Sequence, residues 1–333
     1  MPHSGTAGGA ARVYDEQRAA AAGAQGALHP PDGRTDGGHV RPEPLAAAPE
    51  LPTSTLDLSS GTVEYRLRLG GPNAVVVFHG GHLRAGIALG EEELARGGRA
   101  VLVPSRPGYG GTAPAAGRTP EAFADTAAEL CRRLGVRRVA AAVGVSAGGP
   151  TAVAMAARHP DLVRRLLLVS AVGPLPWPAP AARRMGRLAF APHVEAATWA
   201  SVRGMLRANP VAGLRSMMEG LSTEPAADVV DRLPRAHRAA LAGLFCRMRS
   251  GHGFLIDLRA LERGGGNAAL VAQPSLVVAS RKDAAVPFAH AEALAAALGD
   301  ARLLESAADG HLVWFSPDRP RIAAEIDAFL RAA

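Results

Sequence analysis

The chain has 333 residues and 48% of them are hydrophobic, so it can bury a sizeable core and differs from fibrous and disordered proteins. Its formal net charge is +7, but only 4% of the residues are aromatic, which leaves few side chains on which nucleic-acid bases can stack. We therefore expect no nucleic-acid partner. The two cysteines, Cys131 and Cys246, are too few for a disulfide framework or a cysteine-rich metal site, and they predict a reducing, cytoplasmic location.

Residues 1–52 are rich in alanine, glycine and proline and show no sustained apolar periodicity, which predicts a disordered N-terminal extension. Charged residues interrupt the stretch that most resembles the apolar part of a secretory signal, so the sequence does not support secretion. Residues 139–157 carry no charge, yet their glycines, proline and serine favour a buried strand, a tight turn and a buried helix over a membrane span.

From about residue 60, short β-rich runs alternate with longer helical runs, the pattern of an α/β domain with a mainly parallel sheet. Thr119 is a plausible N-cap for a helix that stops at Gly135. Strands are predicted in 62–70, 74–81, 137–146, 164–172, 275–280 and 301–306 and within the run 99–111, and the other helices in 147–158, 288–299 and 320–332.

Between Gly173 and Gly266 the β-rich runs stop and the composition becomes helical, which predicts an inserted helical unit over 174–266. The core then consists of residues 53–173 and 267–333. Residues 181–263 contain thirteen arginines against seven acidic residues. This excess predicts either a solvated cationic face or a surface that attracts an anionic substrate or partner.

Ser146 lies between two glycines in the run Gly144-Val145-Ser146-Ala147-Gly148, at the predicted junction of a buried strand and a helix. A sharp turn there projects the serine side chain off the sheet edge and presses the flanking residues against neighbouring backbone, which favours glycine. The N-terminus of the following helix supplies free N–H groups for a developing oxyanion. Ser146 is therefore a candidate nucleophile.

A nucleophilic serine needs a histidine as base and a carboxylate that orients the histidine. His311 lies in the loop after the last predicted strand, and Asp283 follows the strand before it. The chain order Ser146, Asp283, His311 is the order expected for this architecture. We predict that Asp283, rather than the nearby Asp309, is the orienting acid, because it can approach the imidazole from behind.

The runs VVVFHGG, PSRPGYGGT, GVSAGG, SRKDAAVP and DGHLVWF resemble successive signatures of the α/β-hydrolase superfamily, and the resemblance covers residues 60–333. It implies a mainly parallel sheet flanked by helices, with a helical cap inserted over the active site. By analogy with the family, Gly81 and Ala147 supply the backbone N–H groups of the oxyanion hole.

The resemblance also helps to decide whether His79 and His82 bind a metal and which residue is the triad acid. His79 and His82 have the spacing of a metal pair, but the first histidine of this loop is structural in the family, and we expect no metal and no cofactor. Some members of the family carry the acid after the sixth strand, where this sequence has no carboxylate, so Asp283 remains the choice. Ser105 stands where an aspartate is frequent.

These features predict a serine hydrolase that cleaves a carboxylic ester or related acyl substrate through an acyl-enzyme intermediate. Its substrate is a small molecule, and an anionic substrate is one of the two alternatives that the cap's arginine excess predicts. Thioester, lactone, amide or carbon–carbon bond hydrolysis and cofactor-free haloperoxidase-like activity remain open. A non-catalytic sensor of small molecules on the same fold is the alternative from another class. The sequence leaves the oligomeric state undetermined.

Overall fold

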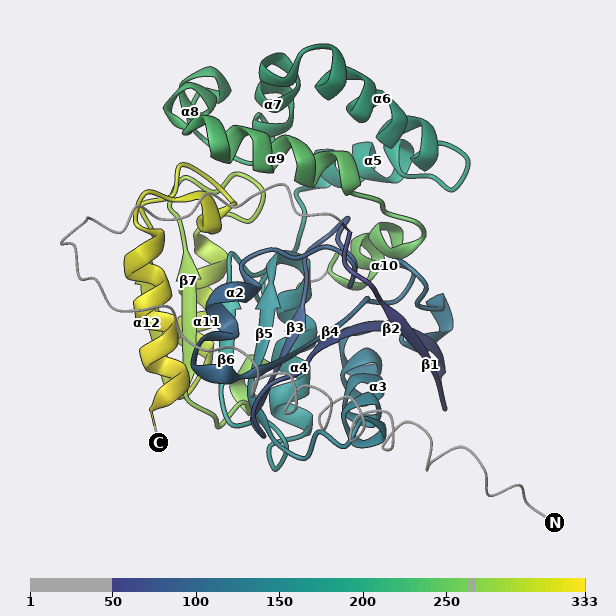
Figure 1. The fold of residues 1–333 in the computed structure, drawn as a ribbon, viewed down its shortest axis with the longest axis vertical. Helices are drawn as coiled ribbons and strands as arrows, with labels where there is room; N and C mark the ends of the chain where they lie inside the picture. Colours follow the sequence, from purple (N-terminus) through teal and green to yellow (C-terminus); the bar gives the residue numbers. More distant parts are fainter. Residues whose placement is uncertain (1–49, 263, 265–266, 333) are drawn as a thin grey trace, which may run out of the picture.

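The computed structural model describes residues 50–262, 264 and 267–332, and its core is one eight-stranded sheet (Figure 1). The order across the sheet is β1-β2-β4-β3-β5-β6-β7-β8. The strands are β1 (Ser54–Leu58), β2 (Gly61–Arg68), β3 (Ala74–Phe78), β4 (Ala100–Pro104), β5 (Val139–Val145), β6 (Leu166–Val169), β7 (Ser275–Ala279) and β8 (Ala301–Glu305). The pairings from β4 to β8 are parallel and those of β1 and β2 are antiparallel, which confirms the predicted mainly parallel sheet.

Alternate residues of the central strands face opposite sides of the sheet, because successive side chains of a strand point in opposite directions. Val75 and Val77 join one apolar cluster with α2 and α12, whereas Val76 and Phe78 join another with α3, α4 and α11. The core helices are α2 (Glu91–Leu94), α3 (Pro120–Arg133), α4 (Gly149–Arg158), α11 (Ala289–Ala297) and α12 (Arg319–Arg331). Short 3₁₀ turns are η1 (Arg96–Gly98), η2 (Pro114–Ala116), η3 (Ser146–Gly148), η4 (Ala268–Leu270) and η5 (Val313–Phe315).

The predicted N-cap of α3 is present, since the Thr119 side chain accepts a hydrogen bond from the N–H of Ala122. Pro120 occupies the first turn, and Gly135 adopts a positive φ of 73° beyond the helix end. The uncharged residues 139–157 form β5, η3 and most of α4. In the described part of the chain, no helix combines the length and apolarity needed to cross a membrane.

Among the described residues, six α-helices lie between β6 and β7, inside the interval 174–266 expected for the insertion, and we call them the cap. They are α5 (Pro180–Ala189), α6 (Glu195–Ala208), α7 (Pro210–Met218), α8 (Ala226–Arg232), α9 (Arg235–Arg247) and α10 (Gly253–Ala260). Figure 1 shows α5 to α9 above one end of the sheet, with α10 beside the core. The apolar cluster on one face of the sheet continues into the cap through Trp199, Leu214 and Leu241.

Two core elements were not expected from the sequence. Strand β1 pairs with β2 at the edge of the sheet, and the four-residue helix α2 follows the loop after β3. Most of the predicted N-terminal extension, residues 1–49, lies outside the described residues. At its end, the N–H of Leu51 donates to the carbonyl of Gly86 and the carboxylate of Glu50 pairs with Arg84.

Candidate active site

Ser146 lies at a sharp turn where β5 ends and η3 leads into α4. Its φ of 52° is in the left-handed region, which costs a residue other than glycine about 1–3 kcal/mol and persists where the surroundings impose it. A Cβ on Gly148 would overlap the carbonyl oxygen of Phe78, and one on Gly144 would lie 2.6 Å from Cα of Gly149. The two glycines therefore permit the close packing that holds the serine in this conformation.

Asp283 and His311 meet at the same edge of the sheet as Ser146. Nδ1 of His311 lies 2.7 Å from Oδ2 of Asp283, and the aspartate side chain is completely buried. The other oxygen, Oδ1, accepts the N–H groups of Ala285 and Val286 at 2.9 and 2.8 Å. Because both carboxylate oxygens have partners, the Asp283 side chain is fixed beneath the imidazole and can set its orientation.

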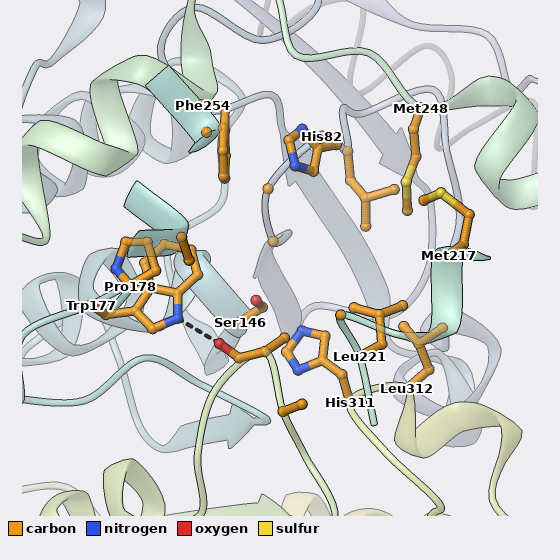
Figure 2. A pocket seen from close by; sticks show the side chains of 18 of the residues that line it. His82, Ser146, Trp177, Pro178, Met217, Leu221, Met248, Phe254, His311 and Leu312 are labelled. Atoms are coloured by element: carbon orange, nitrogen blue, oxygen red, sulfur yellow. Dashed lines mark hydrogen bonds between the residues drawn. The ribbon is translucent and has the colours of Figure 1, made fainter. Parts of the chain in front are cut away.

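The hydroxyl of Ser146 and the ring of His311 lie next to each other at the floor of a cavity of about 670 Å³ (Figure 2). Among the hydrogen bonds of the described residues, none joins Oγ of Ser146 to His311. Catalytic hydrogen bonds are commonly long in ligand-free enzymes and tighten in the substrate complex, so a missing bond at this point is compatible with proton transfer between the two side chains.

Asp309 has other partners, although it is close to His311 in sequence. Its carboxylate accepts hydrogen bonds from Nζ of Lys282 at 2.9 Å and from Nε of Arg232 at 3.0 Å. Burial raises the pKa of Asp309, but the hydrogen bonds from Lys282 and Arg232 outweigh it, and the pKa lies below its ordinary value. Asp309 thus links the core to α8 of the cap.

The loop predicted to supply the oxyanion hole packs directly against the serine. A Cβ on Gly80 would lie 2.8 Å from Cβ of Ser146, so the backbone of this loop runs directly past the serine. Gly81 lines the cavity, and no hydrogen bond of the described residues uses its N–H or that of Ala147. Both groups thus have the free donor that an oxyanion hole requires.

His79 and His82 have separate environments. Nε2 of His79 pairs with the carboxylate of Glu91 at 2.7 Å, whereas Nδ1 of His82 lies 2.8 Å from Oγ of Ser250. The described residues contain no group of three or more metal-ligating side chains. Each histidine therefore has a hydrogen-bonding role in the structure.

A buried ionic network that the sequence did not reveal fixes the same loop. The guanidinium of Arg106 pairs with both carboxylate oxygens of Asp257 on α10 and donates from Nε to the carbonyl of His79 at 2.7 Å. The hydroxyl of Tyr109 donates to Asp257 at 2.6 Å and also contacts the backbone of His82. This network holds the carbonyl before Gly80 and the residue after Gly81. No local sequence signal pairs residues 106 and 257, which are 151 positions apart.

A second group of contacts joins the cap to the loops that carry Asp283 and His311. The N–H of His311 donates to the carbonyl of Leu221 at 2.8 Å, and that of Thr223 donates to the carbonyl of Lys282 at 2.9 Å. On the core side, the hydroxyl of Ser170 donates to the carbonyl of His311 at 2.9 Å. These positioning contacts also lack a sequence signature, because backbone groups make most of them.

The cavity wall is mostly apolar. Among the described residues that line it there is no arginine or lysine, so the cap's arginine excess does not reach the cavity. Several cap arginines instead form ion pairs at the surface, including Arg183 and Arg187 with Glu262 and Arg215 with Asp231. The expectation of an anionic substrate therefore receives no support from the cavity. The lining includes Leu83, Trp177, Phe190, Trp199, Met217, Leu221, Met248 and Phe254.

Comparison with known proteins places these features in a family. The sequence profile of the family described as alpha/beta hydrolase fold matches residues 73–317. An uncharacterized hydrolase of Bacillus subtilis (strain 168), YcgS, is 28% identical over 281 residues, which cover 84% of this chain and 98% of that protein.

Solved structures share the architecture. An alpha/beta hydrolase fold protein from Nakamurella multipartita has a TM-score of 0.66 and 23% identity, covering 84% of this chain and 99% of that one. The enol-lactonase from Burkholderia xenovorans LB400 has a TM-score of 0.61 and 20% identity, covering 84% of this chain and 100% of that one. At these identities, the similarity establishes the fold.

Proposed function

Because the chain belongs to the alpha/beta hydrolase fold family, we propose that it is a serine hydrolase that cleaves a carboxylic ester or related acyl substrate. The observation that carries the proposal is the buried 2.7 Å contact between Asp283 and His311, beside a serine held at positive φ on the cavity floor. A serine with a purely structural role would not require a histidine–aspartate pair beside it or a positive φ.

In the acylation step, Oγ of Ser146 attacks the carbonyl carbon and transfers its proton to Nε2 of His311. Asp283 stabilises the imidazolium that forms, because its carboxylate faces the Nδ1 proton. The N–H groups of Gly81 and Ala147 donate to the oxyanion of the tetrahedral intermediate. His311 then protonates the leaving alcohol and the acyl-enzyme remains.

In the deacylation step, His311 removes a proton from water, and the resulting hydroxide attacks the acyl carbonyl. The tetrahedral intermediate then collapses, His311 returns the proton to Oγ of Ser146, and the acid leaves. The apolar wall supports a mostly hydrocarbon acyl group, because burial of such surface contributes roughly 25 cal/mol per Å². A cavity of about 670 Å³ is within the usual range for sites that enclose small molecules.

The test combines active-site labelling with turnover. A fluorophosphonate probe should label the wild-type protein and leave Ser146→Ala unlabelled, with mass spectrometry placing the adduct on Ser146. A panel of esters, thioesters, lactones and amides of varied chain length identifies the bond. If the folded protein resists the probe and turns over no acyl compound, the sensor hypothesis replaces this proposal.

A further inference from the structure

His82 occupies a special position in the cavity wall. It directly follows Gly81 and has a φ of 65°, a left-handed conformation that residues other than glycine rarely adopt. Its ring lies among three aromatic rings, with centroids 4.7 Å from Phe190, 5.2 Å from Trp199 and 4.2 Å from Phe254. Figure 2 shows the imidazole reaching into the cavity above Ser146. The ring is thus fixed in a site that faces substrate.

The hydrogen bonds around Ser250 determine which ring nitrogen of His82 carries the proton. The Ser250 side chain is fully buried, and its Oγ accepts the indole N–H of Trp199 at 2.9 Å. Among the described residues, the acceptor available to the Ser250 hydroxyl proton is Nδ1 of His82, at 2.8 Å. If Nδ1 carried a proton, that buried hydroxyl would have no acceptor, which costs about 1–3 kcal/mol. A neutral His82 therefore carries its proton on Nε2.

The surroundings also keep the imidazole uncharged. Burial, with a further contribution from the positive charge of Arg106, lowers the pKa of His82 to about 3. At neutral pH the ring is therefore a neutral donor through Nε2, and no hydrogen bond of the described residues uses this atom. An imidazolium at this position would instead favour an anion.

Two other polar side chains of the wall, those of Thr198 and Trp177, already donate within the protein. The hydroxyl of Thr198 donates to the carbonyl of Ala189 at 2.6 Å, and the indole N–H of Trp177 donates to the carbonyl of Ala285 at 2.7 Å. His290 is the second histidine of the wall outside the proposed triad, and its Nδ1 accepts the N–H of Gly173 at 3.0 Å. Substitution of His290 therefore provides a control, because it removes a histidine from the same wall without touching His82.

We propose that Nε2–H of His82 is a specificity-determining donor that binds a neutral oxygen of the substrate, such as an ether, ketone or hydroxyl group in an otherwise apolar acyl chain. The inference rests on the proposed hydrolase function and narrows its substrate class. His82 is two residues after Gly80, which packs on Ser146, and consecutive Cα atoms are about 3.8 Å apart. An oxygen several bonds from the scissile carbonyl is thus within its reach.

The experiment uses p-nitrophenyl hexanoate and three analogues in which oxygen replaces the methylene at chain position 3, 4 or 5. The quantity of interest is kcat/KM for each ether ester divided by that for hexanoate. His82→Phe keeps an aromatic ring and removes the donor, whereas His82→Gln supplies an amide donor near the position of Nε2. His290→Phe and Met248→Leu change the same wall while leaving His82 intact. Differences in the intrinsic reactivity of the esters cancel when the ratio is compared between variants.

At one oxygen position or more, His82→Phe should lower the ratio about five- to tenfold, the effect of one hydrogen bond. His82→Gln should restore part of it, and Met248→Leu should leave it within about twofold. A ratio that is unchanged in His82→Phe at every position, or that falls only in His290→Phe, overturns the proposal.

A binding measurement keeps the inference separate from turnover. Calorimetry of the Ser146→Ala protein with hexanamide and its ether analogues should show the same preference, again lost in the Ser146→Ala/His82→Phe double variant. If no ester is hydrolysed by the wild type, the proposed function fails, while the amide affinities still decide the role of His82. Equal affinities for hexanamide and all of its analogues would refute the donor role.

Discussion

The imidazole of His311 bonds to the carboxylate of Asp283, which is 28 residues away in sequence, and not to that of Asp309, which is two residues away. Asp283 follows β7 and accepts two backbone N–H groups through its second oxygen. Asp309 turns instead toward Lys282 and Arg232. The two aspartates therefore have separable roles, one at the proposed catalytic base and the other between core and cap.

The first prediction concerns the orienting acid. Asp283→Asn should lower kcat by roughly 10⁴-fold, because an amide cannot stabilise the imidazolium and favours the wrong tautomer. Asp309→Asn should remain within about tenfold of wild type, since its carboxylate does not contact His311. The measurement is kcat on the best ester, with circular dichroism to verify folding. The opposite pattern would move the role of orienting acid to Asp309.

The second prediction concerns pH and the cap. The pKa of Asp309 is lowered in the folded protein, so its ion pairs stabilise the fold fully above its unfolded pKa of about 3.9. This contribution is lost as pH falls through the lower folded-state pKa. The free energy of unfolding of Asp309→Asn, measured by urea unfolding, should therefore be lower than that of the wild type by at most about 1 kcal/mol at pH 7, and the difference should vanish in stronger acid. A difference that is constant with pH would contradict this account.

The third prediction tests the packing around the nucleophile. Gly148→Ala forces a Cβ against the carbonyl of Phe78, so it should destabilise the protein by about 1–3 kcal/mol and reduce turnover. The matched control is Gly204→Ala in α6, where an added Cβ meets nothing within 4 Å. That change should stabilise the protein by about 0.5–1 kcal/mol. Urea unfolding measures the free energy of unfolding of both variants. If the two substitutions change it by a similar amount, the turn at Gly148 tolerates a side chain.

The fourth prediction concerns the buried network that fixes the loop after β3, which carries the proposed oxyanion-hole donor Gly81. Asp257→Ala leaves the buried charge of Arg106 without its carboxylate, so the free energy of unfolding should fall by about 3–5 kcal/mol. The control is Asp231→Ala, which removes an exposed pair with Arg215 and should change stability by about 0.5 kcal/mol or less. If urea unfolding shows that both variants lose the same free energy of unfolding, the buried pair contributes no more to stability than the surface pair.

The fifth prediction separates the apolar cavity from the cationic cap surface. A carboxylate at the end of the acyl chain would enter a wall without arginine or lysine among the described lining residues, and its desolvation would be uncompensated. The mono-p-nitrophenyl ester of adipic acid should therefore have kcat/KM more than about tenfold below that of the hexanoate. If the anionic ester is preferred and the preference shrinks with added salt, the cap arginines do attract substrate.

Much of the core could be predicted from the sequence, because its signals are local. Continuous apolar runs identified the buried strands, Thr119 and Pro120 marked the start of α3, and the change in composition near Gly173 predicted a helical insertion. The glycines at 144 and 148 indicated a turn that admits no Cβ, and the structure supplies the backbone atoms that they approach. Strand β1 and helix α2 were missed because both are short and depend on packing against β2 and α12.

Tertiary structure decided how the site is held and what it can bind. The sequence by itself determined that a serine, an aspartate and a histidine follow three strands in a recognisable order. The sequence also determined that the cap carries excess positive charge. It did not determine that the arginines stay out of the cavity wall, because side-chain direction depends on how the helices pack. Two contacts join residues more than 150 positions apart: the ion pair of Arg106 with Asp257 and the hydrogen bond of His82 with Ser250. Such contacts have no local pattern, since folding alone brings their partners together.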